Sequence, residues 1–450
     1  MRSATEPTAN LSYFMLGGYA LVGRAQAIQA LCLSWFFTML SPGIGAEASL
    51  ASIGRYVVIL GATLSVFLRS GIISGSFGVS RPVAAVCGLG LLFILHSIFF
   101  STIPDVSLLK AILWTLVLAT LMSAWEGLSN EERERVVNQI FGGLIAIMLI
   151  SLPLLVSPLG YLRNATGFQG ILNHPQAFGP TIALLGTWAA SQLFAQARPS
   201  WSIIGLAGAA LVLVVLSEAR TAGLAMVLGV CVAIVSAPIL SGRPLRGVMP
   251  GLRSQRVWVV LGAVLFVAVA FAPRLSGVVE HYLSKSGRAG ELQSVLEAYD
   301  RSRGGLMDEM WRNVTLHPFT GIGFGIASAP HEMQVERDPI LGLPVSASIE
   351  KGVLPLAILE ELGIIIAAVV GLWFFGLLRH GARAGVTPLA ITATALLLNM
   401  GESTFFSPGG VGLLSLVLIC WAATSERRPS RRCIDGVAVG KHVPARNSEP

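Results

Sequence analysis

Long apolar runs separated by short polar loops are the feature that most limits what this chain can fold into. Runs of roughly 17 to 25 residues recur along the chain, the length that an α-helix needs to cross the hydrocarbon core of a bilayer. Only 12% of the 450 residues are charged, about half the fraction expected of a soluble protein. We therefore expect an all-α, polytopic integral membrane protein.

The apolar runs predict roughly twelve membrane spans of helical length. We place them at Ala25–Leu40, Tyr56–Leu68, Val83–Ile103, Leu108–Trp125, Val137–Val156, Phe178–Ala195, Trp201–Leu216, Thr221–Leu240, Val257–Ala272, Val353–Leu378, Pro388–Met400 and Gly409–Thr424. Tyr56–Leu68 and Pro388–Met400 are shorter than the roughly 20 residues that a span needs. We expect each of these two to extend into a neighbouring loop or to be broken.

Basic residues in the short loops indicate the orientation, because cytoplasmic loops carry an excess of lysine and arginine. Loops with arginine, such as the one that follows Leu240, alternate with Ile103–Ser107 and Gly401–Pro408, which have no basic residue. Arg55 and Arg163 are single exceptions on the other side. This alternation predicts that both termini are cytoplasmic and that residues 273–352 lie outside the cytoplasm.

Residues 273–352, between the ninth and tenth spans, form the longest polar segment within the apolar part of the chain. They hold eight of the 31 basic residues and ten of the 24 acidic residues. Apolar residues recur at helical spacing in two pieces, one at Leu292–Tyr299 and one at Leu306–Val314. The glycine-rich run Gly321–Gly325 follows. A loop of this length usually carries function, so we expect the chemistry of the protein here.

Two further polar segments lie on the same predicted side. Ser217–Thr221 places Glu218 and Arg220 between two uncharged spans, where charge is costly and rarely idle. Arg220 could grip a phosphate with its fork of donors, or the pair could form an interfacial hairpin in which the two charges satisfy each other. His174, just before Pro175, could act as a base or phosphate donor, or could be structural at a helix start.

Three further features of the sequence bear on function: an acidic pair inside a span, the spacing of the histidines and the net charge. Glu360 and Glu361 lie about two turns inside the tenth span, where one of them could be a buried hydrogen-bonding post. No pair of histidines has metal-ligand spacing, so we expect neither a metal nor another cofactor. The net charge of +7 reflects the loop arginines rather than a nucleic-acid partner.

Taken in order, these polar segments resemble the bacterial O-antigen ligase and polymerase family of inner-membrane glycan-assembly proteins. The matching pieces are Gly167–Pro175, Ser217–Thr221, Ser302-Arg303 leading to Trp311, His317–Gly325, Glu350–Gly352 and Glu360–Gly363. The resemblance divides the chain into N-terminal helices (1–164), a core (165–375), C-terminal helices (376–424) and a cytoplasmic, disordered tail (425–450). Ligases of this family carry a His-Asn pair where this chain has Gly352-Val353. The residues before it, Glu350-Lys351, resemble a branch associated with exopolysaccharide or capsule genes.

The resemblance implies a glycosyltransferase that uses an undecaprenyl-diphosphate-linked oligosaccharide on the periplasmic face of the inner membrane. Arg220 and Arg303 would hold the diphosphate, and Glu350 would be the general base unless it only pairs with Lys351 or a loop arginine. The remaining expected roles divide between substrate contact and structure. We expect substrate contacts from Arg288, Lys351, His174 and Trp311, and structural roles for Glu361, Gly321 and Gly323.

Two rival functions remain open from the sequence. A transporter or flippase with a large outer gate would also be polytopic, although such proteins often show internal repeats, and we find no convincing repeat here. A non-catalytic subunit of a glycan-assembly complex is the other alternative. Membrane lipid and other polysaccharide-assembly proteins are the further partners that we expect.

Overall fold

The structure is a computed structural model that describes most of the apolar part of the chain. The described residues are 6–41, 51–70, 80–163, 166–270, 295–337, 342, 344–347, 351–401 and 403–425. Arg288, Glu350 and the tail predicted to be disordered therefore lie outside the described residues, apart from Ser425 at the start of the tail. Arg303 lies in a described helix, but its side chain lies outside the description.

The described residues form 15 α-helices. In the first half of the chain these are α1 (Glu6–Val22), α2 (Arg24–Met39), α3 (Ala51–Leu68), α4 (Arg81–Phe100), α5 (Pro104–Glu126), α6 (Asn130–Ser151), α7 (Pro175–Ala195) and α8 (Trp201–Leu216). The second half holds α9 (Arg220–Ser241), α10 (Leu245–Val248), α11 (Gln255–Ala270), α13 (Val295–Leu316), α14 (Leu354–Ala384), α15 (Val386–Leu398) and α16 (Val411–Thr424). Short 3-10 turns, η1 to η4, occupy Leu152–Val156, Pro158–Tyr161, Pro250–Arg253 and Pro330–Glu332.

Five of these helices are long and apolar enough to cross a membrane: α4, α5, α6 with its continuation to Val156, α9 and α14. Shorter apolar helices accompany them, and each predicted span coincides with one of the helices. The structure confirms the all-α class, and its apolar helices are those of a multi-pass membrane protein. The physical reason is that an apolar helix satisfies its own backbone hydrogen bonds and needs no partner segment to do so.

Three details differ from the sequence prediction. The two helical pieces predicted after Leu292 are one helix, α13, which continues through Gly304 and Gly305. Of the two short spans, the one at Tyr56 is extended as expected and begins at Ala51, whereas the one at Pro388 stays short and unbroken as α15. A small antiparallel pair of strands, β1 (Val335–Arg337) and β2 (Pro344–Ala347), was not predicted.

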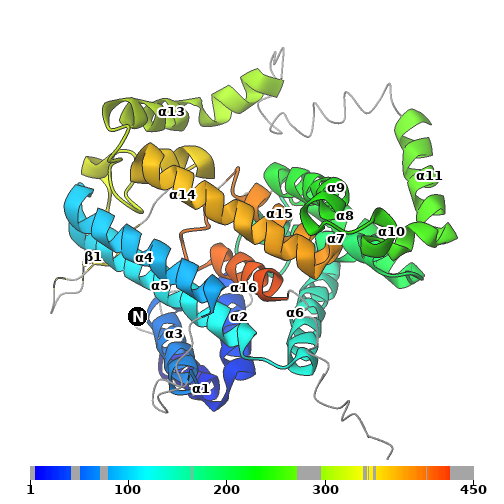
Figure 1. The fold of residues 1–450 in the computed structure, drawn as a ribbon, viewed down its shortest axis with the longest axis horizontal. Helices are drawn as coiled ribbons and strands as arrows, with labels where there is room; N and C mark the ends of the chain where they lie inside the picture. The colour runs from blue at the N-terminus through cyan, green and yellow to red at the C-terminus, as the bar shows by residue number, and fades with distance from the viewer. Residues whose placement is uncertain are drawn as a thin grey trace, which may run out of the picture.

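Helix α14 runs through the centre of the assembly, between the α4–α5 pair and the group formed by α7, α8 and α9 (Figure 1). It also packs against α15 and α16. A cluster of aromatic rings fills the space where α4, α5 and α14 meet the loops, with Phe93, Trp114 and Phe324 in mutual contact. Helix α13 packs on α14 and buries Met310 there.

The helix ends fall into two groups, and arginines mark one of them. Arg24 donates to the carbonyl oxygens of Gly127 and Arg69, at the ends of α5 and α3. Arg133 donates to those of Trp125 and Thr424, at the ends of α5 and α16. A guanidinium at a helix C-terminus satisfies free carbonyls and complements the negative end of the helix dipole.

The other group of helix ends carries four loops that contact one another. We call it the loop face, defined by residues 166–175, 216–221, 317–326 and 399–405; the first three contain polar segments that the sequence analysis singled out. Backbone hydrogen bonds join these loops, for example from Phe168 N to Leu216 O (2.9 Å). Arg220, His174, Gly321 and Gly323 lie in these loops, and the backbone carbonyls of Lys351 and Glu361 accept hydrogen bonds from them.

Candidate functional site

A break in the central helix organises the loop face. Gly363, inside α14, has φ 73° and ψ 169°, which only glycine adopts readily and which interrupts the helix. The carbonyls of Glu360 and Glu361, freed by the break, accept hydrogen bonds from Ile322 N (2.9 Å) and Gly323 N (3.0 Å). Beyond the break, Ile364 N donates to Pro318 O (2.8 Å). The loop 317–326 thus supplies the backbone partners that a broken membrane helix requires.

The glycines of this loop allow it to lie so close to α14. Gly321, Gly323 and Gly325 all have positive φ. A Cβ atom at Gly321 would overlap the backbone of Glu361, and one at Gly323 would overlap Ser101. Both positions therefore require glycine for conformation and for space. In the structure, Gly321 and Gly323 hold the loop against two different helices.

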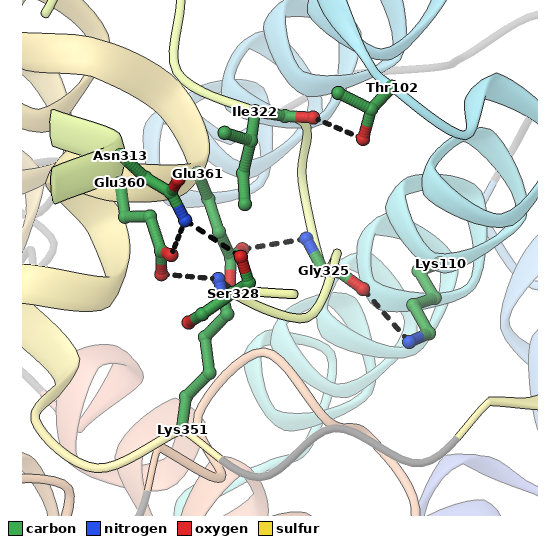
Figure 2. A network of polar contacts seen from close by, with 9 residues as sticks. All are labelled: Thr102, Lys110, Asn313, Ile322, Gly325, Ser328, Lys351, Glu360 and Glu361. Carbon is green, nitrogen blue, oxygen red and sulfur yellow. Dashed lines mark hydrogen bonds and ion pairs between the residues drawn. The ribbon is translucent and has the colours of Figure 1, made fainter. Parts of the chain in front are cut away.

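Three charged side chains are buried where this loop meets α14; we call Lys351, Glu360 and Glu361 the charged cluster (Figure 2). Lys351 Nζ lies 2.8 Å from Glu360 Oε2 and 3.1 Å from Glu361 Oε1. The three side chains are 1%, 0% and 6% exposed. Buried charges are stable only when they are paired and hydrogen-bonded, and each member of this cluster has such partners.

Hydrogen bonds connect the charged cluster to three other elements (Figure 2). Asn313 of α13 donates from Nδ2 to Glu360 Oε1 and to Ser328 O, both at 2.8 Å. Gly325 N donates to Glu361 Oε2 (2.6 Å), and Lys110 of α5 donates to Gly325 O (2.9 Å). Lys351 is thus the cation between the two glutamates, and Lys110 is linked to the charged cluster through the backbone of Gly325. The network fixes α13, α5 and the glycine loop relative to α14.

Arg220 lies at the other end of the loop face, as the first residue of α9. The turn before it places Glu218 at φ 55°, an uncommon conformation for a residue with a side chain. Thr166 Oγ1 donates to Glu218 Oε2 (3.3 Å), so the turn is held by the loop 166–175. Arg220 is half-buried. A helix N-terminus carries a partial positive charge, so this position favours an anion by its dipole as well as by the guanidinium.

The loop 399–405 connects the turn at Arg220 with the charged cluster. Asn399 Oδ1 accepts from Thr404 N (2.8 Å) and Phe405 N (2.7 Å), which folds the loop tightly. On one side, Gly401 lies so close to Thr221 that a Cβ atom would overlap the threonine side chain. On the other side, Ser403 N donates to Lys351 O (3.1 Å). The structure thus brings the segments of Arg220 and Lys351 to one face through a shared loop.

A small hollow of about 20 Å³ opens at the first turn of α9, where Thr221 and Ala222 line it. Its walls come from α7, α9, α15, α16 and the loop 399–405. The lining residues are Gln176, Pro180, Thr221, Ala222, Leu398, Gly401, Thr404, Val411 and Ser415. Amide and hydroxyl groups among them can bind polar groups of a ligand that reaches Arg220.

His174 is held at the start of α7 by its own backbone. It is the N-cap residue, and its Nδ1 accepts a hydrogen bond from Gln176 N (2.9 Å), with Pro175 in the first turn. The geometry matches the structural interpretation of this residue. Burial of the ring, and then the positive charge of Arg163, lower the pKa of His174 below its ordinary value of 6.5. The neutral ring, which can accept this bond, is therefore favoured.

The remaining predicted residues are not drawn into this network. Trp311 is 59% exposed on α13. Glu350 and Arg288 lie outside the described residues, as does the side chain of Arg303. The backbone of Arg303 lies in α13, the helix that Asn313 ties to Glu360.

Lys110, Asn313 and Asn399 carry much of the network, and the sequence analysis did not single them out. Lys110 is a lone cation inside an apolar run, which was a usable signal, since charge in a membrane span is rarely idle. Asn313 and Asn399 gave no such signal, because a polar residue near the end of a helix is common. His96 was a similar omission: it lies in α4 and its Nε2 donates to Thr320 O (2.6 Å).

No model of a known protein family matches this chain, and no curated protein matches it. The resemblance to glycan-assembly proteins therefore rests on the ordered set of short motifs in the sequence.

Proposed function

We propose that this protein is a glycosyltransferase of a bacterial inner membrane, with about twelve spans and both termini in the cytoplasm. It transfers or polymerises an oligosaccharide carried on undecaprenyl diphosphate, at the periplasmic face. Two supports are independent of each other: the ordered motifs in the sequence, and the arrangement of the loop face in space.

One observation carries the proposal: the loop 399–405 contacts both Thr221, the second residue of α9, and the backbone of Lys351. Arg220 and the residue that follows Glu350 are thereby fixed on one face of the helical assembly. A transferase that uses a diphosphate leaving group needs a cation for the leaving group and a base for the acceptor on the same face. The two motifs are far apart in the sequence, so their meeting is a property of the fold.

The chemistry follows from the residue types. The acceptor hydroxyl attacks the anomeric carbon, the bond from that carbon to the diphosphate oxygen breaks, and the diphosphate leaves with the electron pair. Arg220 and Arg303 offset the charge that develops on the diphosphate, because a guanidinium binds phosphate oxygens in pairs. Glu350 takes the proton of the acceptor hydroxyl.

Lys351 has a different role in this proposal from the substrate contact that its motif suggested. Its ammonium group is 1% exposed and lies between two carboxylates, so binding a substrate would require it to leave both. We assign it to positioning: it fixes the chain at the residue next to Glu350. The charged cluster would then hold the general base in place without touching the sugar.

The test is an assay of purified protein with an undecaprenyl-diphosphate-linked oligosaccharide, in which release of undecaprenyl diphosphate is measured. The wild-type protein should release it, and Arg220→Lys and Arg303→Lys should each lose most of the activity, because a point charge does not reproduce paired phosphate contacts. Arg312→Lys is the matched control, since Arg312 is an exposed arginine on α13. Full activity in both Arg220→Lys and Arg303→Lys would contradict the role of these arginines.

The broken helix also favours one alternative, a transporter of a lipid-linked glycan. Discontinuous membrane helices with buried charge at the break are typical of secondary transporters. The same purified protein in vesicles distinguishes the two functions. A transporter would move the intact lipid-linked glycan across the bilayer and release no undecaprenyl diphosphate.

A further inference from the structure

Arg55 is one of the two arginines that depart from the predicted charge pattern, and the proposed reaction does not use it. It lies near the start of α3, half-buried, beside a hollow between α2, α3 and the start of α16. The hollow is lined by Ser34, Trp35, Thr38, Arg55, Ile59, Pro408, Gly409, Gly410 and Leu413. Its volume is about 10 Å³, which is room for about one oxygen atom or one water.

The start of α16 supplies the first feature of an anion site. Gly410 is the N-cap of this 14-residue helix, and no side chain caps it among the described residues. Gly409 lies so close to the Arg55 guanidinium that a Cβ atom would be 2.7 Å from Nη1. The glycines thus let a guanidinium approach a helix N-terminus, where free N–H groups and the helix dipole already favour negative charge.

Trp35 supplies an independent feature. It is 3% exposed, it lines the hollow, and its buried indole N–H has no hydrogen-bond partner within the described ranges. An unsatisfied buried donor is costly, so a ligand oxygen in the hollow would relieve that cost. The indole N–H of Trp114 is also without such a partner there, but Trp114 packs against four aromatic rings, whose faces accept weakly.

The charge of Arg55 is not balanced by a carboxylate in the part of the chain that the structure describes. Its Nη2 donates to Tyr56 Oη (3.3 Å), and its guanidinium lies 5.1 Å from the centre of the Tyr56 ring. Both contacts orient the guanidinium and neither neutralises it. Apolar residues at the hollow, Ile59 and Leu413, continue into helices that are themselves apolar. The surroundings therefore suit an anion whose other end is in lipid.

We propose that this hollow binds a phosphate group, with one oxygen inside against the Trp35 N–H and the others on the Arg55 guanidinium and the start of α16. The group can belong to an anionic lipid headgroup or to a free phosphate. The site is separate from the proposed transferase residues, and its test does not depend on the proposed transferase activity.

The test uses the full-length protein purified in detergent and compares two phosphate sources. One arm measures binding of phosphatidylglycerol by native mass spectrometry, and the other measures binding of inorganic phosphate by ³¹P NMR titration. Arg55→Gln should weaken binding about tenfold or more, since it removes the charge-assisted bonds. Arg163→Gln is the control. Arg163 also departs from the predicted charge pattern but is exposed, so this variant should bind phosphate as the wild type does.

A second pair of variants tests the indole donor without changing charge. Trp35→Phe keeps a ring but removes the N–H, so it should weaken binding in the same arm in which Arg55→Gln does. Trp114→Phe is its control and should leave binding unchanged. Loss in the lipid arm alone identifies a headgroup site, and loss in the phosphate arm identifies a site for the free ion. Equal binding by the wild type and Arg55→Gln in both arms would overturn the proposal.

Discussion

At the scale of single residues, the charged cluster shows how a membrane protein keeps charge in its interior. Lys351 alone pairs with both Glu360 and Glu361 among the described residues, at 2.8 Å and 3.1 Å. Removing a charge from water costs several kcal/mol even after relaxation, so each member depends on the others. The cluster therefore responds very differently to the loss of one charge and to the loss of all three.

Lys351→Met should destabilise the protein by about 3–5 kcal/mol, because it leaves two carboxylates buried without their cation. A large fall in the thermal midpoint of the detergent-purified protein is the expected measurement. Arg312→Met, at an exposed position on α13, should have little effect. The triple variant Lys351→Met/Glu360→Gln/Glu361→Gln should recover much of the lost midpoint. A single Lys351→Met variant as stable as the wild type would show that the cluster is not a network of mutual dependence.

His174 gives a prediction about pH. Because its neutral ring accepts the bond from Gln176 N, the cap is complete above pH 6.5 and is lost as the pH falls through the lowered pKa of the folded protein. His174→Asn places a good N-cap with no titrating group at this position. Relative to this variant, the wild type should lose about 1 kcal/mol of stability at low pH. The difference in thermal midpoint, measured from pH 8 down to pH 5, should grow in that direction; a constant difference would argue against the cap.

At the scale of elements, α14 and the glycine loop form one unit. The break at Gly363 exposes backbone groups that the loop 317–326 satisfies, and the loop in turn needs its positive-φ glycines to reach them. Neither segment has complete hydrogen bonding without the other. Changes at the break should therefore affect the loop, even though the two are far apart in the sequence.

Gly363→Ala tests this dependence. Its φ of 73° and ψ of 169° are unfavourable for alanine, and the new Cβ would overlap Phe319 O. We expect a loss of at least about 1–3 kcal/mol from the backbone alone. Gly371→Ala is the control in the same helix, because no described atom lies within 4 Å of its Cβ position. It should be neutral or slightly stabilising, and thermal unfolding of both variants would make the comparison. Equal midpoints would mean that the break is not fixed by the loop.

At the scale of the whole molecule, the two groups of helix ends differ in the groups that satisfy their backbone hydrogen bonds. Arginines close one end by donating to helix C-termini, as Arg133 does for α5 and α16. Backbone hydrogen bonds and glycine turns close the loop face. These arginines thereby stabilise the helix ends on which they lie.

Cysteine labelling tests the sides of the membrane that the charge pattern predicts. Glu332 is exposed near β1, and Glu134 is exposed at the start of α6, on the arginine-rich end. Glu332→Cys and Glu134→Cys, each in a background without the five native cysteines, should be labelled from opposite sides of intact inner-membrane vesicles. We expect Glu332→Cys on the periplasmic side. Labelling of both from one side would contradict the orientation. Ser328, in the same predicted periplasmic segment as Glu332, is less suitable for labelling because it is buried.

The sequence by itself determined the class of the protein and the positions of its helices. A bilayer rewards any sufficiently long apolar segment that satisfies its own backbone, so composition and length along the chain are enough. For the same reason the sequence located polar segments such as Gly321–Gly325 in the loop face and Glu360–Glu361 in α14.

Only the tertiary structure decided how these segments are used. The sequence left open whether the two short spans are extended or broken, and it did not predict the break in the long span at Gly363, where the loop 317–326 supplies the backbone partners. Lys351 pairs with Glu360 and Glu361, and Asn313 with Glu360, through contacts that no local periodicity encodes. Burial of a charge depends on which partners arrive from distant parts of the chain, and only the folded arrangement of the helices determines that.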